Sequence, residues 1–68
     1  MITIGTRVRL RRAPPGITLA SPLGTVLGPE IRPGMWVIEL DQAGSVTYAF
    51  DRPVSLVLVP VRDMEIAG

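Results

Sequence analysis

Cysteine and histidine are both absent from this 68-residue sequence, which limits how the chain can be stabilised and what it can bind. No disulfide can form, and zinc-finger and iron–sulfur sites are excluded. The six acidic residues are scattered and lack the spacing of a calcium-binding loop. We therefore expect no metal site and no cofactor, and stability must come from packing within the chain or against another chain.

Lysine is also absent, whereas arginine occurs seven times. A GC-rich genome favours arginine codons over lysine codons, which explains the bias without functional selection. The alternative is selection of the guanidinium group, which recognises carboxylates and phosphates through two parallel hydrogen bonds. The composition alone does not decide between these explanations.

The residues that most often carry out catalysis are missing. Without histidine, cysteine or lysine there is no imidazole to activate Ser21, Ser45 or Ser55, no thiol nucleophile and no Schiff base. The glycines occur singly and form no phosphate-binding loop. We therefore predict no catalytic residues, and a binding or assembly module rather than an enzyme.

Long hydrophobic runs are absent too. The longest nearly continuous apolar run covers residues 54–61, well short of the ~20 residues that a membrane-spanning helix needs. The N-terminal segment lacks the basic start and apolar core of a secretory signal. We therefore expect a soluble, cytoplasmic protein with no membrane partner.

Seven prolines and seven glycines divide the chain into strand-sized segments. The longest stretch without either residue, 35–43, is below the usual length of a helix. The segments with the apolar patterns of strands are 6–12, 23–27, 35–40, 45–50, 54–59 and 64–66. They predict a single all-β domain over residues 1–68, a small barrel of five to six short antiparallel strands with no long helix. Closure into a barrel is favoured because it removes exposed sheet edges.

The connections are predicted from residues that favour turns. Residues 17–22 form a longer loop, and residues 60–63 form one 3₁₀ turn. Residues 32–35 have proline and glycine in the two central positions of a type II turn. A hairpin loop is expected over 41–44, with Gly44 at a positive φ.

Taken in order, these segments resemble the SH3-like barrels of bacteria, including the KOW-type domains. In such barrels a Gly-x-x-Val strand, a long first loop, a Gly-Thr-Val strand, a hairpin and a short closing strand follow one another. The matching pieces are Gly5-Thr-Arg-Val-Arg-Leu10, Leu23-Gly-Thr-Val-Leu-Gly28, Trp36-Val-Ile-Glu-Leu-Asp41 and Asp63-Met-Glu-Ile66. The resemblance implies an SH3-like barrel, a fold that serves nucleic-acid binders, protein-docking modules and enzyme subunits.

A narrower resemblance is to the plasmid-borne type II dihydrofolate reductases, which are SH3-like barrels that act as tetramers. It lies in Arg7-Val-Arg9, the strand around Gly24, Pro33-Gly34 and Gly44-Ser-Val46. That family has a Val-Gln-Ile-Tyr motif at its pore, whereas residues 46–50 here read Val-Thr-Tyr-Ala-Phe, without the glutamine. This resemblance implies an oligomeric enzyme with a site at a symmetry axis, which is the second alternative for the function.

Charge is distributed unevenly along the chain. The first 29 residues contain four arginines and no acid, whereas the rest contains three arginines and all six acids. Strand alternation puts Arg7, Arg9 and Arg11 on one face, about 6.6–6.8 Å apart, close to the spacing of phosphates along a nucleic-acid strand. Together with Arg12, this arginine row predicts either a nucleic-acid interface or ion pairs with acids of this chain or of another.

Two of the expected strands are apolar on both faces, although a small barrel has only one interior. The outward faces would be covered by the folded-back first loop or by another protein. Our leading hypothesis is a non-catalytic module that self-associates into a homo-oligomer or docks as a small subunit on a partner protein. The first alternative is nucleic-acid binding through the arginine row. The expected partner-binding residues are Trp36, Tyr48, Leu56 and Leu58.

Overall fold

The computed structural model describes residues 2–29 and 34–67, which form one antiparallel sheet. Its strands, in chain order, are β1 (Arg7–Leu10), β2 (Ile17–Thr18), β3 (Leu23–Pro29), β4 (Met35–Val46), β5 (Ala49–Pro60) and β6 (Met64–Ile66). A 3₁₀ helix, η1 (Val61–Asp63), connects the last two strands. The described residues contain no α-helix, so the expected all-β class is confirmed.

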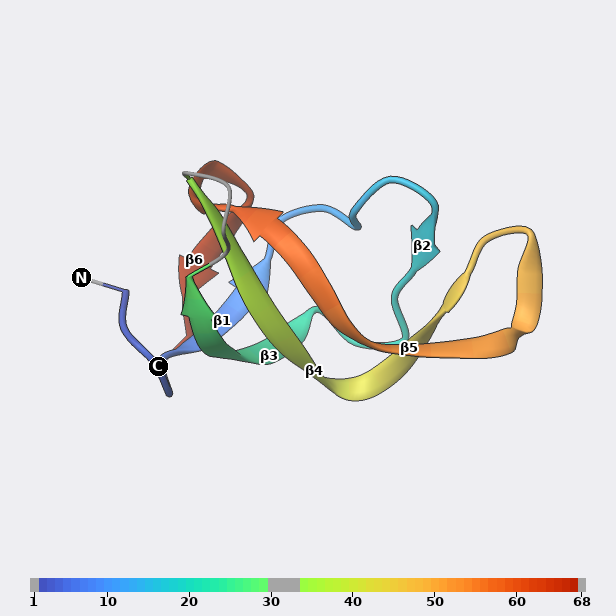
Figure 1. The fold of residues 1–68 in the computed structure, drawn as a ribbon, viewed down its shortest axis with the longest axis horizontal. Helices are drawn as coiled ribbons and strands as arrows, with labels where there is room; N and C mark the ends of the chain where they lie inside the picture. The colour runs from blue at the N-terminus through green and yellow to red at the C-terminus, as the bar shows by residue number, and fades with distance from the viewer. Residues whose placement is uncertain (1, 30–33, 68) are drawn as a thin grey trace.

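The strands are arranged in the order β6–β1–β3–β4–β5, and β2 pairs with the far end of β4. β4 and β5 form a long hairpin that extends along the long axis of the molecule, away from β1 and β6 (Figure 1). β1 pairs with both β3 and β6, so the two ends of the chain meet in the sheet. This arrangement is compatible with a small barrel-like fold.

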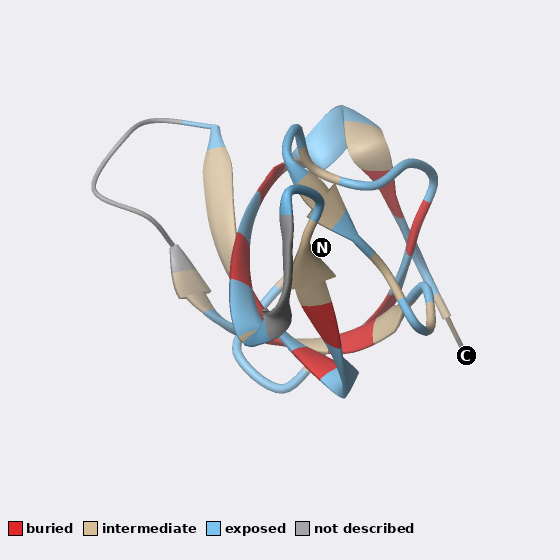
Figure 2. Cartoon of the chain, turned by 90° about the vertical axis from the view of Figure 1, so that its right-hand side faces the viewer, coloured by how far each residue is buried: buried red, intermediate tan, exposed pale blue. Residues whose placement is uncertain are grey.

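The core lies inside the curve of the sheet, where the buried stretches gather (Figure 2). In β1, Val8 and Leu10 are buried while Arg7 and Arg9 are exposed, as the alternation along a strand predicts. The buried apolar side chains are Val8, Leu10, Val26, Ile38, Leu40, Val57, Val59 and Met64. Each of these residues lies on β1, β3, β4, β5 or β6, and Val54 of β5 and Ile17 of β2, beside the far part of the hairpin, also pack against this core.

The hairpin loop expected over 41–44 is wrong, because β4 continues through these residues to Val46. The chain reverses direction at Thr47 and Tyr48 instead. The strand expected over 45–50 is therefore also wrong, since it is divided between the end of β4 and the start of β5.

A large bulge explains why the chain does not turn back where its composition suggested. Pairing between β4 and β5 jumps from Glu39↔Leu56 to Gly44↔Val54, so the four residues 40–43 of β4 lie opposite Ser55 alone, three more than regular pairing needs. A bulge of this kind bends the strand that carries it. The turn-forming residues of this stretch thus mark a bend inside a long strand rather than its end.

Gly44 does not have the positive φ expected for it; the glycines with positive φ are Gly5, Gly16 and Gly34. Gly44 is needed for a different reason, which is the close approach of β2. A Cβ atom at this position would lie 2.5 Å from the carbonyl oxygen of Thr18. Only glycine lets the two backbones come this close.

The other boundaries lie near the expected ones. The 3₁₀ turn and the closing strand 64–66 are confirmed. β1 is shorter than expected, β5 is longer because Pro53 lies within it, and β2 lies in a segment expected to be a loop. Residues 32 and 33 of the expected type II turn lie outside the described part of the chain, and Gly34 has the positive φ expected there.

Candidate protein-binding surface

An apolar patch lies on the outer face of the adjacent strands β3, β4 and β5. Leu56 and Leu58 of β5 are 53% and 41% exposed, and Leu27 of β3 is 41% exposed. Val37 of β4 pairs with Leu58 on one side and with Gly28, next to Leu27, on the other. The alternate residues of β4 and β5 are buried in the core. On the outer face the exposed Glu39 lies opposite Leu56, so the apolar area ends at this charged side chain. The four residues Leu27, Val37, Leu56 and Leu58 are called the outer patch below.

The two aromatic residues expected to anchor a partner lie outside this patch. Trp36, at the start of β4, is half-buried and packs against the core. Tyr48 lies in the turn at the other end of β4, where it is 87% exposed. The structure therefore brings together Leu56 and Leu58 but separates both aromatics from them.

Leu27 and Val37 are members of the patch that sequence reasoning did not select. The alternation along residues 35–40 already placed Val37 on the face opposite Trp36, which was a usable signal. Whether Leu27 of β3 lies beside Val37 depends on the register between β3 and β4, which includes a bulge between Val26 and Gly28. No local pattern in the sequence reveals that register.

The arginine row lies on β1 and directly after it, and its first member makes the closest contact. Arg7 pairs with both carboxylate oxygens of Asp41: Nη1 donates to Oδ1 at 2.6 Å and Nη2 to Oδ2 at 2.5 Å. Nη1 also donates to Thr25 Oγ1 at 2.8 Å. Since β3 lies between β1 and β4, this ion pair spans β3 and ties Arg7 to the bulge of β4.

The other three arginines of the row also face acids of the same chain. Arg9 and Arg11 both approach Glu65 on β6, each with an N···O distance of 3.9 Å. Arg12 lies 3.3 Å from Asp63. All four positive charges of the arginine row therefore have an acidic neighbour within the chain, which weakens the field that they present to an anionic ligand.

The Arg7–Asp41 pair also changes how its two members titrate. The hydrogen bonds from Arg7 lower the pKa of the Asp41 carboxyl below its ordinary value, and they raise the pKa of Arg7. Partial desolvation acts in the opposite direction on both groups and is outweighed. Both groups are therefore charged throughout the neutral pH range, and the pair is present under physiological conditions.

Changing Arg7, Arg9 and Arg11 to glutamine tests whether the arginine row binds nucleic acid. Because the row is paired internally, we expect the wild-type protein to bind single- and double-stranded nucleic acid weakly at physiological salt. The slope of log Kobs against log salt should then change by less than about 1 in the triple variant. Arg52 and Arg62, which are exposed elsewhere, give a matched control when changed to glutamine. Tight wild-type binding with a slope change of roughly 2–3 on losing the row would support the nucleic-acid alternative.

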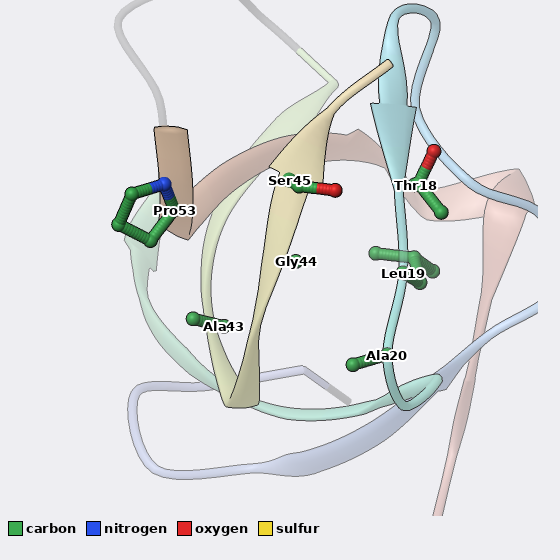
Figure 3. A pocket seen from close by; sticks show the side chains of 7 residues that line it. All are labelled: Thr18, Leu19, Ala20, Ala43, Gly44, Ser45 and Pro53. Carbon is green, nitrogen blue, oxygen red and sulfur yellow. The ribbon is translucent and has the colours of Figure 1, made fainter. Parts of the chain in front are cut away.

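An open hollow of about 400 Å³ lies between β2, the bend of β4 and β5 (Figure 3). It is lined by Thr18, Leu19, Ala20, Ala43, Gly44, Ser45 and Pro53. Among the residues that the structure describes, the side chains lining the hollow are uncharged, and its two hydroxyl groups belong to Thr18 and Ser45.

No family model, curated protein or solved structure matches this chain. Across residues 2–29 and 34–67, no helix is long and apolar enough to cross a membrane. The same residues contain no group of three or more acidic, histidine or cysteine side chains placed to hold a metal ion. The outer patch and the arginine row are thus the two surfaces on which a functional proposal can be based.

Proposed function

We propose that the protein is a non-catalytic assembly module, which uses the outer patch to self-associate or to dock as a small subunit on a partner protein. The observation that carries this proposal is the patch itself. It consists of aliphatic side chains on three adjacent strands, on the face of the sheet that does not form the core. Contiguous exposed apolar surface of this kind marks interaction sites, because its contact with water is unfavourable.

The fold that we propose for this module is an SH3-like barrel. Three features support it: the strand order β6–β1–β3–β4–β5, the long connection between β1 and β3, and the 3₁₀ turn before the closing strand. Such barrels serve many functions, so the fold does not by itself indicate a partner. The proposed function therefore rests on the patch.

The size of the molecule is consistent with assembly through one face. The accessible surface is 4500 Å², and a standard protein interface uses about 800 Å² from each partner. That share is less than a fifth of the whole surface. A 68-residue chain without disulfides also has a small core and gains stability when it associates.

Light scattering over a hundredfold dilution series tests the self-associating form of this proposal. We expect an average mass above 7.3 kDa at micromolar concentration, falling as the protein is diluted. Leu58→Gln should weaken association by roughly tenfold or more, because it places an amide in the patch. Ile66→Gln is the matched control, since Ile66 is 58% exposed on β6 at the other edge of the sheet. A constant mass of 7.3 kDa in every sample would contradict self-association, and docking on a different protein would remain as the other form of the proposal.

A further inference from the structure

β5 is an edge strand that has a partner on one side. In the part of the chain that the structure describes, β5 (Ala49–Pro60) pairs with β4 alone. Its second edge is called the free edge below. An unpaired edge of this length presents a row of backbone donors and acceptors that can pair with another strand.

The register shows which backbone groups face the free edge. The N–H of Val61 donates to the carbonyl oxygen of Gly34 at 3.4 Å, so Val61 is directed toward β4. Backbone N–H and C=O groups alternate in direction along a strand. Those of Val57 and Val59 therefore point toward β4, whereas those of Leu56 and Leu58 point toward the free edge. The backbone of Pro60 also points toward the free edge. Because proline has no N–H, its presence at this position costs no hydrogen bond to β4.

The central part of the free edge carries no charged residue or proline, and the bulge opposite Ser55 lies on β4 and not on β5 itself. Monomeric proteins protect edge strands with charged residues, prolines, bulges or short length. Residues 54–59 read Val-Ser-Leu-Val-Leu-Val, with no charge, proline or glycine, and the flanking residues are Pro53 and Pro60. Leu56 and Leu58 also belong to the outer patch, so the free edge and the patch form one continuous surface.

We infer that the occupant of the free edge is β5 of a second copy of this chain, paired antiparallel about a two-fold axis; this inference rests on the proposed function. Two-fold pairing brings the same segment against itself, and 54–59 is complementary to itself because it is uncharged and, except for Ser55, apolar. With Leu56 on the axis, the cross-strand neighbours on the face that carries Leu56 are Leu56 with Leu56, and Val54 with Leu58. These are apolar pairs, which stabilise antiparallel sheets, and on the other face Ser55 lies opposite Val57.

Charge also favours this register and this occupant. With Leu56 on the axis, Arg52 lies opposite Pro60 of the second copy, whereas centring the pair on Val57 would put Arg52 opposite Arg62. Like charges directly opposite each other are destabilising. The net charge of each chain is only +1, so two copies repel one another little. Among the described strands, β2 and β6 also have one partner each. They are less suited to this role, because β2 has two residues, and β6 has three and carries Glu65, which faces Arg9 and Arg11.

Leu56→Pro tests the inference directly, because its N–H faces the free edge and is not needed for pairing with β4. We expect the wild type to form dimers at micromolar concentration and Leu56→Pro to be monomeric, with dimerisation weakened by roughly a hundredfold or more. Leu56→Ala is the matched control: it shortens the same side chain but keeps the N–H, so it should dimerise with a loss of about tenfold or less. Circular dichroism shows whether the proline variant is folded.

Leu56→Cys provides a test that does not depend on how proline is tolerated. The chain has no native cysteine, and opposed Cα atoms in this register are about 5.5 Å apart, within the range that a disulfide spans. Mild oxidation should therefore link Leu56→Cys into covalent dimers much faster than Ser55→Cys, whose two copies are offset along the strands. If the wild type assembles but these two cysteine variants link equally slowly, or if a folded Leu56→Pro variant still assembles, the free-edge inference is overturned and the proposed function stands. A wild type that is monomeric at all concentrations would overturn both the inference and self-association.

Discussion

Replacing Gly44 by valine is expected to lower the free energy of unfolding by about 2–3 kcal/mol, the cost of forcing extra atoms into a closely packed site. The added Cβ would lie 2.5 Å from the carbonyl oxygen of Thr18 and 3.6 Å from Cγ2 of Ile17. A backbone oxygen cannot rotate out of the way as a side chain can, so β2 would have to move off β4. A domain of this size has about 3–10 kcal/mol of stability in total, so a large fraction of it would be lost.

Gly28→Val is the matched control for this substitution. Gly28 also lies in a strand, has no positive φ and has no heavy atom within 4 Å of the position that a Cβ would take. Its replacement should change the free energy of unfolding by less than about 1 kcal/mol. Urea unfolding at one fixed protein concentration measures both variants. Equal midpoints for the two would mean that β2 does not approach β4 as closely as described.

Ile38→Ala is expected to have the largest effect on stability, a loss of about 2–5 kcal/mol. Ile38 is fully buried between its cross-strand neighbours Val26 and Val57, both of which also lie in the core. Shortening it removes apolar contacts and leaves a cavity that its neighbours fill only partly. Much of the variant should be unfolded at room temperature, because the loss is comparable to the stability of a small domain.

The adjacent residue on the other face of β4 provides the comparison. Val37 belongs to the outer patch and is only partly buried, so Val37→Ala should cost about 1 kcal/mol or less in unfolding. If the outer patch is an interface, Val37→Ala should instead weaken association in the dilution series. Thermal unfolding at a fixed and low protein concentration separates the two effects. Equal destabilisation by the two substitutions would show that the outer face is packed against the fold and is not available to a partner.

The short-range patterns of the sequence predicted the parts of the fold that depend on local rules. The alternation in β1 identified Val8 and Leu10 as core residues, and the Pro60 to Asp63 segment was recognised as a 3₁₀ turn. The middle of the hairpin was predicted wrongly, because the Asp41 to Gly44 segment has the composition of a turn. β4 pairs with β5 on both sides of residues 40–43 and with β2 at Ser45 and Val46, so the chain continues as a strand through this segment, and no local pattern reveals these long-range contacts.

The functional surfaces also combine features that local sequence patterns predict with features that depend on long-range contacts. The arginine row could be placed on one face from its spacing, but its acidic partners, such as Asp41 for Arg7, are distant in sequence and required the strand order. Leu56 and Leu58 were selected because β5 is apolar on both faces, a pattern visible in the sequence. Trp36 was expected to bind a partner, yet its position in the alternation places it toward the core.

The pairing of β1 with β6 has a consequence for how the chain reaches its native state. Val8 lies opposite Ile66 and Leu10 lies opposite Met64, so the sheet joins segments from nearly opposite ends of the chain. Closing so long a loop costs chain entropy before the contact contributes stability, and folds dominated by such contacts form in milliseconds to seconds rather than microseconds. A chain that lacks residues 64–66 would leave β1 with one neighbour and would leave the core without Met64. The smallest unit that can fold cooperatively therefore extends from β1 through β6, and partly synthesised chains would expose the apolar strands β4 and β5 until the closing strand is available.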